Sequence, residues 1–449
     1  MKNLTIENAV KACSGRYVGP EGLLGTEIMS VQTDSRAVTR GAMFAAIRGE
    51  RTDGHLYIPS AGESGAACAL CEAEVSGCPL PQIVVPSTEK ALQDIAAFYR
   101  QQFSIPFLGI TGSVGKTTAK EMSAAVLSQH FNVMKTQGNF NNELGVPLTI
   151  FSLRGEHEAA VVEMGISHFG EMSRLTRIVC PDIALFTLIG YAHLESLGDR
   201  KGVLRAKSEI LEGMKRDASI IINGDDDLLL GMECSQRKIS FGKGEKCDFR
   251  AENIRLLPGC TVCDVRSDFG TLTLTVPGHG EHLAYAAAEG AAVGKLFGLT
   301  DEEIAAGAAS YRSVGSRSRL VDAGDIRIID DCYNANPNSV ASALRSLASM
   351  DGRRVCILGD MLELGENARQ LHRNIGEMAA SLGIDSVITA GELSEDTALG
   401  AGEISRHFDS VEELVAALPR LIQPGDCVLV KASHSMHFER IVSALSERG

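Results

Sequence analysis

Short apolar runs alternate with amphipathic segments through the middle of the chain. The runs 106–110, 159–163 and 183–188 are mostly apolar, which is typical of strands buried on both faces of a parallel sheet. Apolar residues recur at helical spacing in 119–130, and the Ala- and Gly-rich segment 282–297 is typical of a closely packed helix. The order of these elements predicts an α/β unit with a mostly parallel sheet.

The last third of the chain repeats a regular alternation of strand and helix patterns. Strands are expected at 326–329, 355–358, 386–389 and 427–430, and helices at 339–350, 369–382, 411–421 and 438–445. This alternation predicts a parallel sheet of Rossmann type. Because the fingerprint G-x-G-x-x-G is missing from this part, we do not expect it to be a dinucleotide domain.

The first hundred residues have shorter strand-like runs at 42–47, 67–71 and 82–85, separated by turns that contain Gly and Pro. They predict a small α/β unit. A helix expected over 88–103 completes this unit, and Pro106 then interrupts the pattern.

Three domains are expected, because 449 residues are too many for one ordinary core and domains typically span about 100 to 200 residues. The first boundary is placed near residue 104, before Pro106, and the second in the Ser-, Arg- and Gly-rich segment 311–319. The predicted domains are therefore 1–104, 105–312 and 313–449.

Composition narrows the classes of protein that this chain can be. With 44% hydrophobic and 22% charged residues it is an ordinary globular chain, and no apolar run approaches the roughly 20 residues of a membrane span. The net charge of −14 argues against an extended nucleic-acid surface. The twelve cysteines lack the paired spacing of zinc sites, and the start of the chain lacks an apolar signal-peptide core. We therefore expect a cytoplasmic protein with free thiols.

The sequence TGSVGKTT follows the strand expected at 106–110 and is typical of a phosphate-binding loop. Gly112 and Gly115 allow a tight turn whose N–H groups face phosphate oxygens, Lys116 adds a positive charge, and the Thr117 hydroxyl can bind magnesium. The loop is shorter than the Walker A pattern, which has a further glycine four residues before Gly-Lys-Thr. As a bare pattern it is also compatible with an ordinary turn.

Polar side chains follow two of the buried strands of the middle unit. Glu163 ends the run 159–163, and His193 comes shortly after the run 183–188. Ligands of doubly wound sheets lie beyond the carboxyl ends of the strands, so both side chains should face the phosphate loop. A carboxylate there suits magnesium, whereas histidine is an unusual ligand for so hard an ion and is more often an ordinary side chain.

Some charged residues have no function that their type alone indicates. Lys207 lies on an expected helix, where a lysine is by default solvated. The three aspartates 225–227 follow an apolar run and are typical of a solvated turn.

Three loops concentrate hydrogen-bonding side chains. TDSR at 33–36 and RGERTDGH at 48–55 could bind an anionic or sugar-nucleotide ligand, and the amide-rich loop GNFNNELGVP at 138–147 could contact a substrate. Solvated turns remain the alternative for all three. The candidate residues in these loops are Ser35, Arg36, Asp53, His55, Asn139 and Asn142.

Taken in order, these motifs resemble those of the Mur ligase family. The shortened loop TGSVGKTT has the form found in that family, and the chain also carries TDSR, DGH, GNFNNELGVPLT, VVEMGISHFGE, AHLE, AKSE, DDCYNANPNS and LGDMLELGE. These motifs cover nearly the whole chain. Within the family, the chain is similar to the ligases that add D-alanyl-D-alanine to UDP-N-acetylmuramoyl-tripeptide.

The resemblance implies a three-domain fold: a small domain for the UDP end of the substrate, a central ATPase domain and a mobile Rossmann-like domain. It implies that ATP phosphorylates the terminal carboxylate of the tripeptide and that the amine of D-alanyl-D-alanine attacks the acyl phosphate. It also implies cytoplasmic peptidoglycan precursor synthesis by a protein that we expect to be a monomer. A MurE-type or folylpolyglutamate synthase-type ligase is the nearest alternative, and a nucleotide-dependent regulatory protein is an alternative from another class.

The resemblance also implies roles for individual positions. The implied catalytic residues are Lys116, His193 and Lys207, of which Lys207 matches a lysine that family members carry as a carbamate. The implied ATP-binding residues are Gly112, Ser113, Gly115, Lys116, Thr117, Thr118, Arg317, Asp331, Tyr333, Asn334 and Asn336. The implied magnesium ligands are Thr117, Glu163 and His193. Ser35, Arg36, Asp53 and His55 match positions on the UDP side, and Asn139 and Asn142 match the central substrate loop.

Two positions depart from the family pattern. Where the family usually has an adenine-side asparagine in HNxxNA, this chain has Ala286, and His434 stands where arginine is common. The contact to adenine is therefore missing or supplied by another residue.

Overall fold

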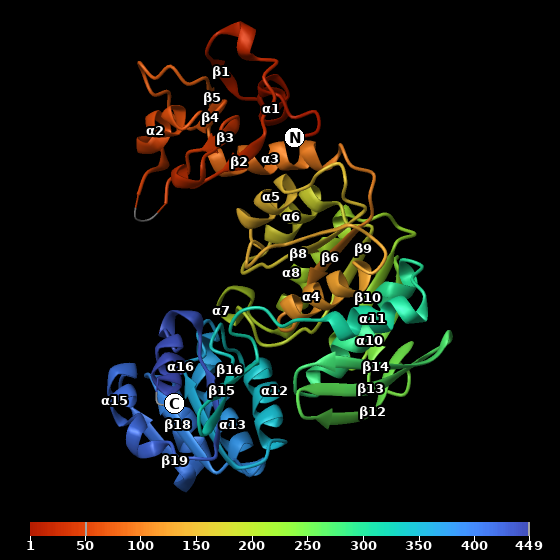
Figure 1. The fold of residues 1–449 in the computed structure, drawn as a ribbon, viewed down its shortest axis with the longest axis vertical. Coiled ribbons are helices and arrows are strands. Elements are labelled where there is room, and N and C mark those ends of the chain that lie inside the picture. Colours follow the sequence, from red (N-terminus) through yellow and green to blue (C-terminus); the bar gives the residue numbers. More distant parts are fainter. Residues whose placement is uncertain (50–51, 448–449) are drawn as a thin grey trace.

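The computed structural model describes residues 1–49 and 52–447, so Glu50 and Arg51 of the loop 48–55 lie outside the described residues. The chain forms three α/β units, each built on its own sheet, that follow one another along an arc (Figure 1). The N-terminal unit lies at the top of this view, the central unit on the right and the C-terminal unit at the lower left. The α/β fold class predicted from the sequence is confirmed.

The N-terminal unit has a five-stranded sheet in the order β1-β5-β4-β3-β2, parallel except for the β1–β5 pair. Its strands are β1 (Arg16–Val18), β2 (Ser30–Gln32), β3 (Ala42–Ala45), β4 (Cys68–Cys71) and β5 (Gln82–Val84). Its helices are α1 (Ile6–Cys13), α2 (Ile58–Glu63) and α3 (Thr88–Arg100), with the short 3₁₀ helices η2 (Ser35–Ala37) and η3 (Gly54–Tyr57) in the two polar loops.

The central unit has a nine-stranded sheet in the order β14-β13-β12-β11-β10-β9-β6-β8-β7. Its strands are β6 (Phe107–Thr111), β7 (Val133–Lys135), β8 (Ala159–Glu163), β9 (Ile183–Phe186), β10 (Ser219–Asn223), β11 (Arg237–Gly242), β12 (Phe249–Leu257), β13 (Cys260–Ser267) and β14 (Gly270–Pro277). Its helices are α4 (Lys116–Leu127), α5 (Gly145–Phe151), α6 (Glu171–Val179), α7 (Leu194–Leu197), α8 (Arg200–Ser208), α9 (Asp227–Gly231), α10 (His282–Leu296) and α11 (Asp301–Ser310). The sheet is parallel from β7 to β12 and ends in the antiparallel strands β13 and β14. This antiparallel extension was not predicted.

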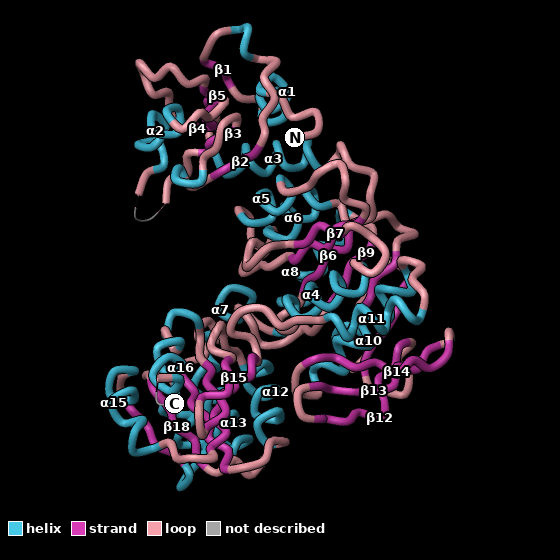
Figure 2. Tube along the Cα trace, viewed as in Figure 1, coloured by secondary structure: helices cyan, strands magenta, loops and turns pink. Residues whose placement is uncertain are grey.

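The C-terminal unit has a six-stranded sheet in the order β15-β16-β20-β17-β18-β19, parallel except for the β15–β16 pair. Its strands are β15 (Arg319–Ala323), β16 (Ile326–Asp330), β17 (Arg353–Gly359), β18 (Ser386–Ala390), β19 (Ser405–Phe408) and β20 (Asp426–Lys431). Its helices are α12 (Pro337–Ala348), α13 (Ala368–Ser381), α14 (Ser394–Ala401), α15 (Val411–Leu421) and α16 (Glu439–Ser446). Helices lie on both faces of this sheet, as Figure 2 shows. The four predicted strands and four predicted helices are present, and β15, β19 and α14 were not predicted.

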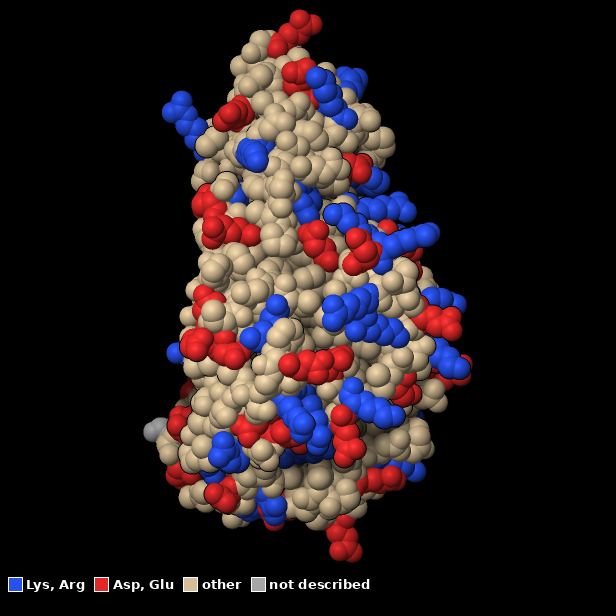
Figure 3. All heavy atoms as spheres, turned by 90° about the vertical axis from the view of Figure 1, so that its right-hand side faces the viewer, with Lys and Arg blue, Asp and Glu red and all other residues tan. Residues whose placement is uncertain are grey.

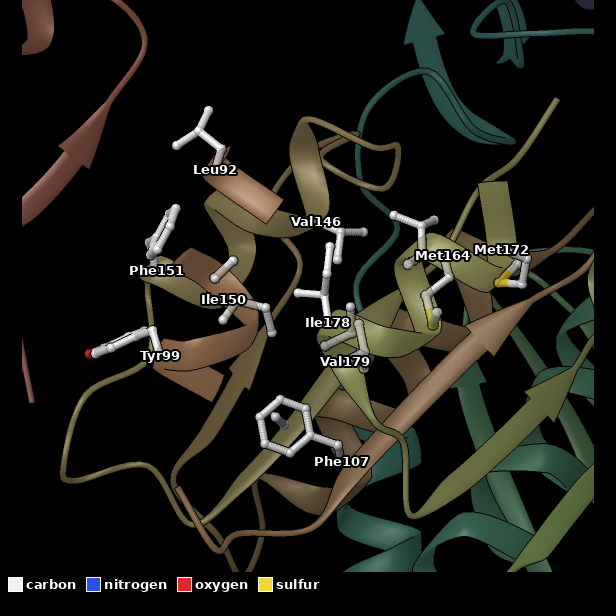
Figure 4. Close-up of a cluster of buried hydrophobic side chains, with 14 of the residues drawn as sticks. Leu92, Tyr99, Phe107, Val146, Ile150, Phe151, Met164, Met172, Ile178 and Val179 are labelled. Carbon is white, nitrogen blue, oxygen red and sulfur yellow. The ribbon is translucent and has the colours of Figure 1, made fainter. Parts of the chain in front are cut away.

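Helix α3 connects the N-terminal unit to the central unit through a continuous apolar core. It packs against α1 on one side and against α5 and α6 on the other. Leu92 and Tyr99 of α3 lie beside α5 (Figure 4), and the Tyr99 hydroxyl donates a hydrogen bond to Leu153 O at 2.7 Å. Both side chains are fully buried. The first boundary, predicted at residue 104, therefore follows a helix that belongs to the core of both units.

Charged side chains of both signs are interspersed on the face of the molecule drawn in Figure 3. Among the described residues, no helix has the length and apolar character needed to cross a membrane.

Candidate functional site

The phosphate loop connects the end of β6 to the start of α4, as predicted. Gly112 has φ 149°, and a Cβ atom there would lie 1.9 Å from Thr187 Oγ1, so only glycine fits. Gly115 is in the left-handed region at φ 87° and precedes the first turn of α4, which has no side-chain cap. The N–H groups of that turn are therefore free to bind phosphate oxygens.

Lys116 folds back over this loop. Its Nζ donates a hydrogen bond to Gly112 O at 2.8 Å. Burial lowers the pKa of Lys116. The nearby charge of Glu163 acts in the opposite direction, and that of Arg317 lowers the pKa further. A phosphate bound in the loop would provide the anionic partner that this ammonium lacks.

Glu163 ends β8, which pairs with β6 in parallel register, so its carboxylate lies beside the phosphate loop. Thr117 Oγ1 donates to Glu163 Oε2 at 2.9 Å, and Asn141 Nδ2 donates to Glu163 Oε1 at 2.7 Å. The Glu163 side chain is buried. Two hydrogen bonds thus fix the carboxylate in the orientation needed to share a ligand with Thr117.

Asn141 was not singled out from the sequence, although it belongs to the amide-rich loop. Its neighbour Asn142 lines the cavity described below, and its Oδ1 accepts a hydrogen bond from Gly145 N at the start of α5. Asn139 is exposed and does not line the cavity. The asparagine richness was the available signal, but it could not distinguish these three residues.

His193 lies at the N-terminus of α7 with φ 56°, and its Nδ1 is 2.6 Å from Glu363 Oε2 of the C-terminal unit. Burial lowers the pKa of His193, although Glu363 acts in the opposite direction. The side chain therefore lies at the junction of two units and beside the phosphate loop.

Lys207 is 1% exposed, so the expectation of a solvated side chain was wrong. It lies on the face of α8 that packs into the central unit, together with Val203 and Ala206. Burial lowers its pKa well below the ordinary value, and the nearby charge of Lys116 lowers it further. Burial beside the phosphate loop therefore favours the neutral form of the Lys207 amine.

The C-terminal unit contributes a second group of predicted residues. The Arg317 guanidinium lies 3.9 Å from the centre of the Tyr333 ring, a cation–π contact. Asp331 Oδ2 is 2.6 Å from Lys431 Nζ, and Asp331 Oδ1 accepts a hydrogen bond from Ser318 N at 2.9 Å. These contacts hold both the arginine and the aspartate at the carboxyl edge of the sheet.

The side chains of two asparagines in the same group accept hydrogen bonds from backbone N–H groups of nearby residues. Asn334 Oδ1 accepts from Ala335 N at 2.9 Å, and Asn336 caps α12 by accepting from Ser339 N at 2.9 Å. Because the Oδ1 atom of Asn336 caps α12, its amide nitrogen is the group that could contact a ligand.

A cavity of about 1740 Å³ opens between the central and C-terminal units. The predicted residues that line it are Ser113, Gly115, Lys116, Thr118, Asn142, Glu163, His193, Arg317, Asp331, Tyr333, Asn334 and Asn336. Gly112, Thr117 and Lys207 are buried and do not line it. One cavity therefore joins the phosphate loop to residues that are more than 200 positions away in the sequence.

The four predicted residues of the N-terminal unit do not line this cavity. Arg36 forms a two-pronged ion pair with Asp34 and, with its backbone N–H, lowers the pKa of Asp34 to about 2. His55 is buried, with Nδ1 2.6 Å from Asp53 Oδ1 and Nε2 accepting from the backbone N–H of Glu72. Ser35 begins η2. These residues shape two surface turns, and their binding of the UDP end stays a prediction.

The far end of the cavity contains polar residues that sequence reasoning missed. Tyr285 Oη donates to Asp225 Oδ2 at 2.8 Å, and Glu289 lies one helical turn beyond Tyr285 on α10.

Asp226 is 2% exposed and accepts hydrogen bonds from the backbone of Ile189 and Leu229, so the interpretation of 225–227 as a solvated turn was wrong for Asp226. The burial of these groups depends on distant segments and had no local signal.

A phosphate loop on a parallel sheet that faces a second α/β unit across a large cavity is typical of a nucleotide-binding enzyme of several domains. The sequence matches the Mur ligase middle domain at residues 110–294, the Mur ligase glutamate ligase domain at 316–434 and the Mur ligase family catalytic domain at 27–100. The chain belongs to the Mur ligase family.

Full-length relatives and solved structures agree with this assignment. The chain is 35% identical to the UDP-N-acetylmuramoyl-tripeptide–D-alanyl-D-alanine ligase of Bacillus subtilis, over 99% of this chain and 98% of the relative. It is similar to a crystal structure of MurF from Acinetobacter baumannii, with TM-score 0.92, 32% identity and 99% of each chain covered. It is also similar to MurF of Thermotoga maritima in complex with ADP, with TM-score 0.84, 28% identity, and 94% of this chain and 99% of that chain covered.

Proposed function

We infer that the protein is an ATP-dependent ligase that joins D-alanyl-D-alanine to UDP-N-acetylmuramoyl-tripeptide. The observation that carries this inference is the single cavity in which the phosphate loop faces the C-terminal unit, in a chain whose full-length relatives bear that name. A carboxylate is a poor electrophile, so the reaction needs an activating phosphoryl transfer before an amine can attack.

In the first step, a carboxylate oxygen of the tripeptide attacks the γ-phosphorus of ATP, and the bond from that phosphorus to the bridging oxygen breaks to release ADP. In the second step, the amine of D-alanyl-D-alanine attacks the acyl carbon, and phosphate leaves with the loss of one proton from nitrogen. Lys116 and the N-terminus of α4 stabilise the negative charge on the transferred group. The enclosing C-terminal unit holds the reactants together and excludes water.

Magnesium fits the acidic end of the cavity. Thr117 Oγ1 and Glu163 Oε2, 2.9 Å apart, are hard oxygen donors beside the phosphate loop, and His193 lines the same cavity. Among the described residues, His, Cys, Asp and Glu side chains form no metal-binding group of three. In nucleotide enzymes, magnesium is usually held by one or two protein oxygens together with phosphate oxygens. Bound there by Thr117, Glu163 and His193, magnesium would neutralise charge on the phosphates.

The buried amine of Lys207 supports its modification to a carbamate. Carbamylation requires the neutral amine, whose nitrogen bonds to the carbon of CO₂ with release of one proton. The burial that lowers the pKa of Lys207 favours this form. The product would place an anion near the positive charge of Lys116, where its oxygens would be available to a magnesium ion bound nearby.

The remaining assignments extend this proposal to the whole molecule. The N-terminal unit would bind the UDP end of the substrate through the turns that contain Ser35, Arg36, Asp53 and His55. The loop with Asn139 and Asn142 would contact the peptide. We expect a monomeric protein that acts in the cytoplasm, where its nucleotide-linked substrates are made.

Phosphate release tests the reaction. We expect release only when ATP, magnesium, UDP-N-acetylmuramoyl-tripeptide and D-alanyl-D-alanine are all present, together with a product whose mass equals both substrates minus water. Release that does not depend on the dipeptide, or hydrolysis with no covalent product, would instead support a nucleotide-driven regulatory protein. Paired assays with tripeptides ending in diaminopimelate or lysine then show which tripeptide is the substrate. An assay with D-alanyl-D-lactate in place of the dipeptide shows whether a depsipeptide is accepted.

A further inference from the structure

A buried carboxyl group with one unpaired oxygen lines the cavity. Glu289 is 4% exposed and lines the cavity. Its Oε1 has no hydrogen-bond partner among the described residues. A buried polar atom left unpaired costs about 1–3 kcal/mol, so a side chain of this kind in a cavity wall points to a ligand that pairs with it.

The strand order places Glu289 on the opposite side of the phosphate loop from the metal site. Glu163 is on β8, which neighbours β6 on one side, whereas α10 packs against α4 and over β10 to β14 on the other. Glu289 also lies close to Tyr311, whose hydroxyl contacts Thr118 at the end of the phosphate loop. A nucleotide with its terminal phosphate near Glu163 therefore directs its nucleoside towards α10.

Of the other polar side chains at the start of α10, His282 also lines the cavity, whereas Glu281 and Tyr285 already have partners. Glu281 forms an ion pair with Lys243 at 2.6 Å, and the Tyr285 hydroxyl donates to Asp225. Ala286 presents only a methyl group to the cavity. Among the described residues of α10, Glu289 is the one whose side chain has a buried oxygen without a hydrogen-bond partner, and it lines the cavity.

We propose that Glu289 hydrogen-bonds the base of the bound ATP and contributes to the selection of adenine. The proposal rests on the ligase reaction inferred above, because that reaction places ATP in the cavity. Adenine carries an exocyclic amino donor beside a ring-nitrogen acceptor. A carboxylic acid offers a matching acceptor and O–H donor, and burial raises the pKa of Glu289 well above its ordinary value, which favours this protonated form.

The test compares ATP with purine riboside 5′-triphosphate, which lacks the 6-amino group, by calorimetric binding to the full-length protein. We expect the unmodified protein to prefer ATP by about 10-fold, the value of one good hydrogen bond. Glu289→Gln retains a donor and an acceptor and should keep this preference. Glu289→Ala and Glu289→Leu should bring the two dissociation constants within about 2-fold of each other, mainly through weaker binding of ATP.

Ser123→Ala is the matched control, because Ser123 Oγ on α4 is also buried and unpaired but does not line the cavity. It should leave both dissociation constants unchanged. If Glu289→Ala and Glu289→Leu fold and keep the full preference for ATP, Glu289 is only a buried acid and the inference is wrong. If the unmodified protein binds ATP but forms no product, the ligase proposal fails instead, so the two failures are distinguishable.

Discussion

The chemistry of single residues is most sharply tested at Lys116. Lys116→Ala removes the ammonium that would face the transferred phosphoryl group, and we expect kcat to fall by at least about 100-fold. The melting temperature should change little, because Lys116 makes one hydrogen bond, to Gly112 O, and burial already lowers its pKa. Phosphate-release kinetics and thermal unfolding measured on the same sample check both parts. Retained activity would show that TGSVGKTT does not bind the reacting phosphates.

Lys207 allows a separate test, because a carbamate depends on dissolved CO₂. The lowered pKa favours the neutral amine, so the carbamate should form more readily than on an ordinary lysine and be lost as pH falls. With ¹³C-bicarbonate we expect one carbamate carbon signal by NMR, together with a loss of activity in CO₂-free buffer that bicarbonate restores.

Lys201→Ala is the control for this experiment, since Lys201 lies on the same helix but is exposed. The carbamate signal should persist in Lys201→Ala and disappear in Lys207→Met. Full activity of Lys207→Met would contradict the proposed modification.

Glu289 should leave a signature in the pH dependence of stability. Its pKa is raised in the folded protein, so between the unfolded pKa of about 4.3 and the folded pKa the native state binds more protons than the unfolded chain. The contribution of Glu289 to stability is therefore fully present at low pH and is lost as pH rises through this window. Glu289→Gln should remove that decline, so urea unfolding should show the variant gaining stability relative to the unmodified protein between pH 5 and pH 8. Parallel pH profiles would mean that Glu289 is ionised in the folded state.

Sequence reasoning found the residues whose position follows from strand ends and loop motifs. Glu163 and the phosphate loop were predictable because parallel strands end at one edge of the sheet. The burial of Lys207 was not, since the inward face of α8 is decided by packing against other segments. Glu289 lies in an Ala-rich helix that predicts close packing and gives no sign of the cavity beyond it.

At the scale of elements, α3 decides whether the N-terminal and central units unfold together. Leu92 is fully buried in the core cluster that spans both units. We expect Leu92→Ala to lower the free energy of unfolding by about 2–5 kcal/mol, through lost burial and the cavity that remains. Urea unfolding should still show one transition for both units. Lys90→Ala, at an exposed position of α3, should change the free energy by less than about 0.5 kcal/mol. Separate transitions in the unmodified protein would show that α3 does not couple the units.

Elements with one dominant signal were predicted well, and elements with weaker signals were not. The strands 159–163 and 183–188 have mostly apolar runs because helices cover both faces of the parallel sheet. Strand β12 alternates buried and exposed residues and includes a register shift between Glu252 and Arg255, so no continuous apolar run marks it. Strand β19 is short and half-exposed, which leaves little hydrophobic pattern to detect.

At the scale of the whole molecule, the site is complete only when the C-terminal unit lies against the central unit. Among the described residues, the contacts across this junction include His279 Nε2 with Ser349 Oγ at 3.0 Å and the following three. Tyr191 N donates to Asn338 Oδ1 at 3.0 Å, Glu195 N donates to Glu363 O at 3.2 Å, and the Glu363 carboxylate contacts His193. The sequence could not predict this arrangement, because contacts between units depend on geometry that no local pattern encodes.

The double variant Asn338→Ala, Glu363→Gln tests whether these contacts set the arrangement of the units. It removes one acceptor and one charge from the junction and leaves the phosphate loop intact, so we expect kcat to fall by about 10- to 100-fold through misplacement of the C-terminal residues. Small-angle X-ray scattering should show a larger radius of gyration without ligands and a return to the unmodified value with ATP and UDP-N-acetylmuramoyl-tripeptide, because ligands that bridge the units favour the closed form.

The exposed pair Arg440 and Glu412, within the C-terminal unit, provides the control, since Glu412→Gln should alter neither the turnover nor the radius of gyration. Unchanged scattering together with unchanged turnover in the double variant would mean that the junction is held by other contacts.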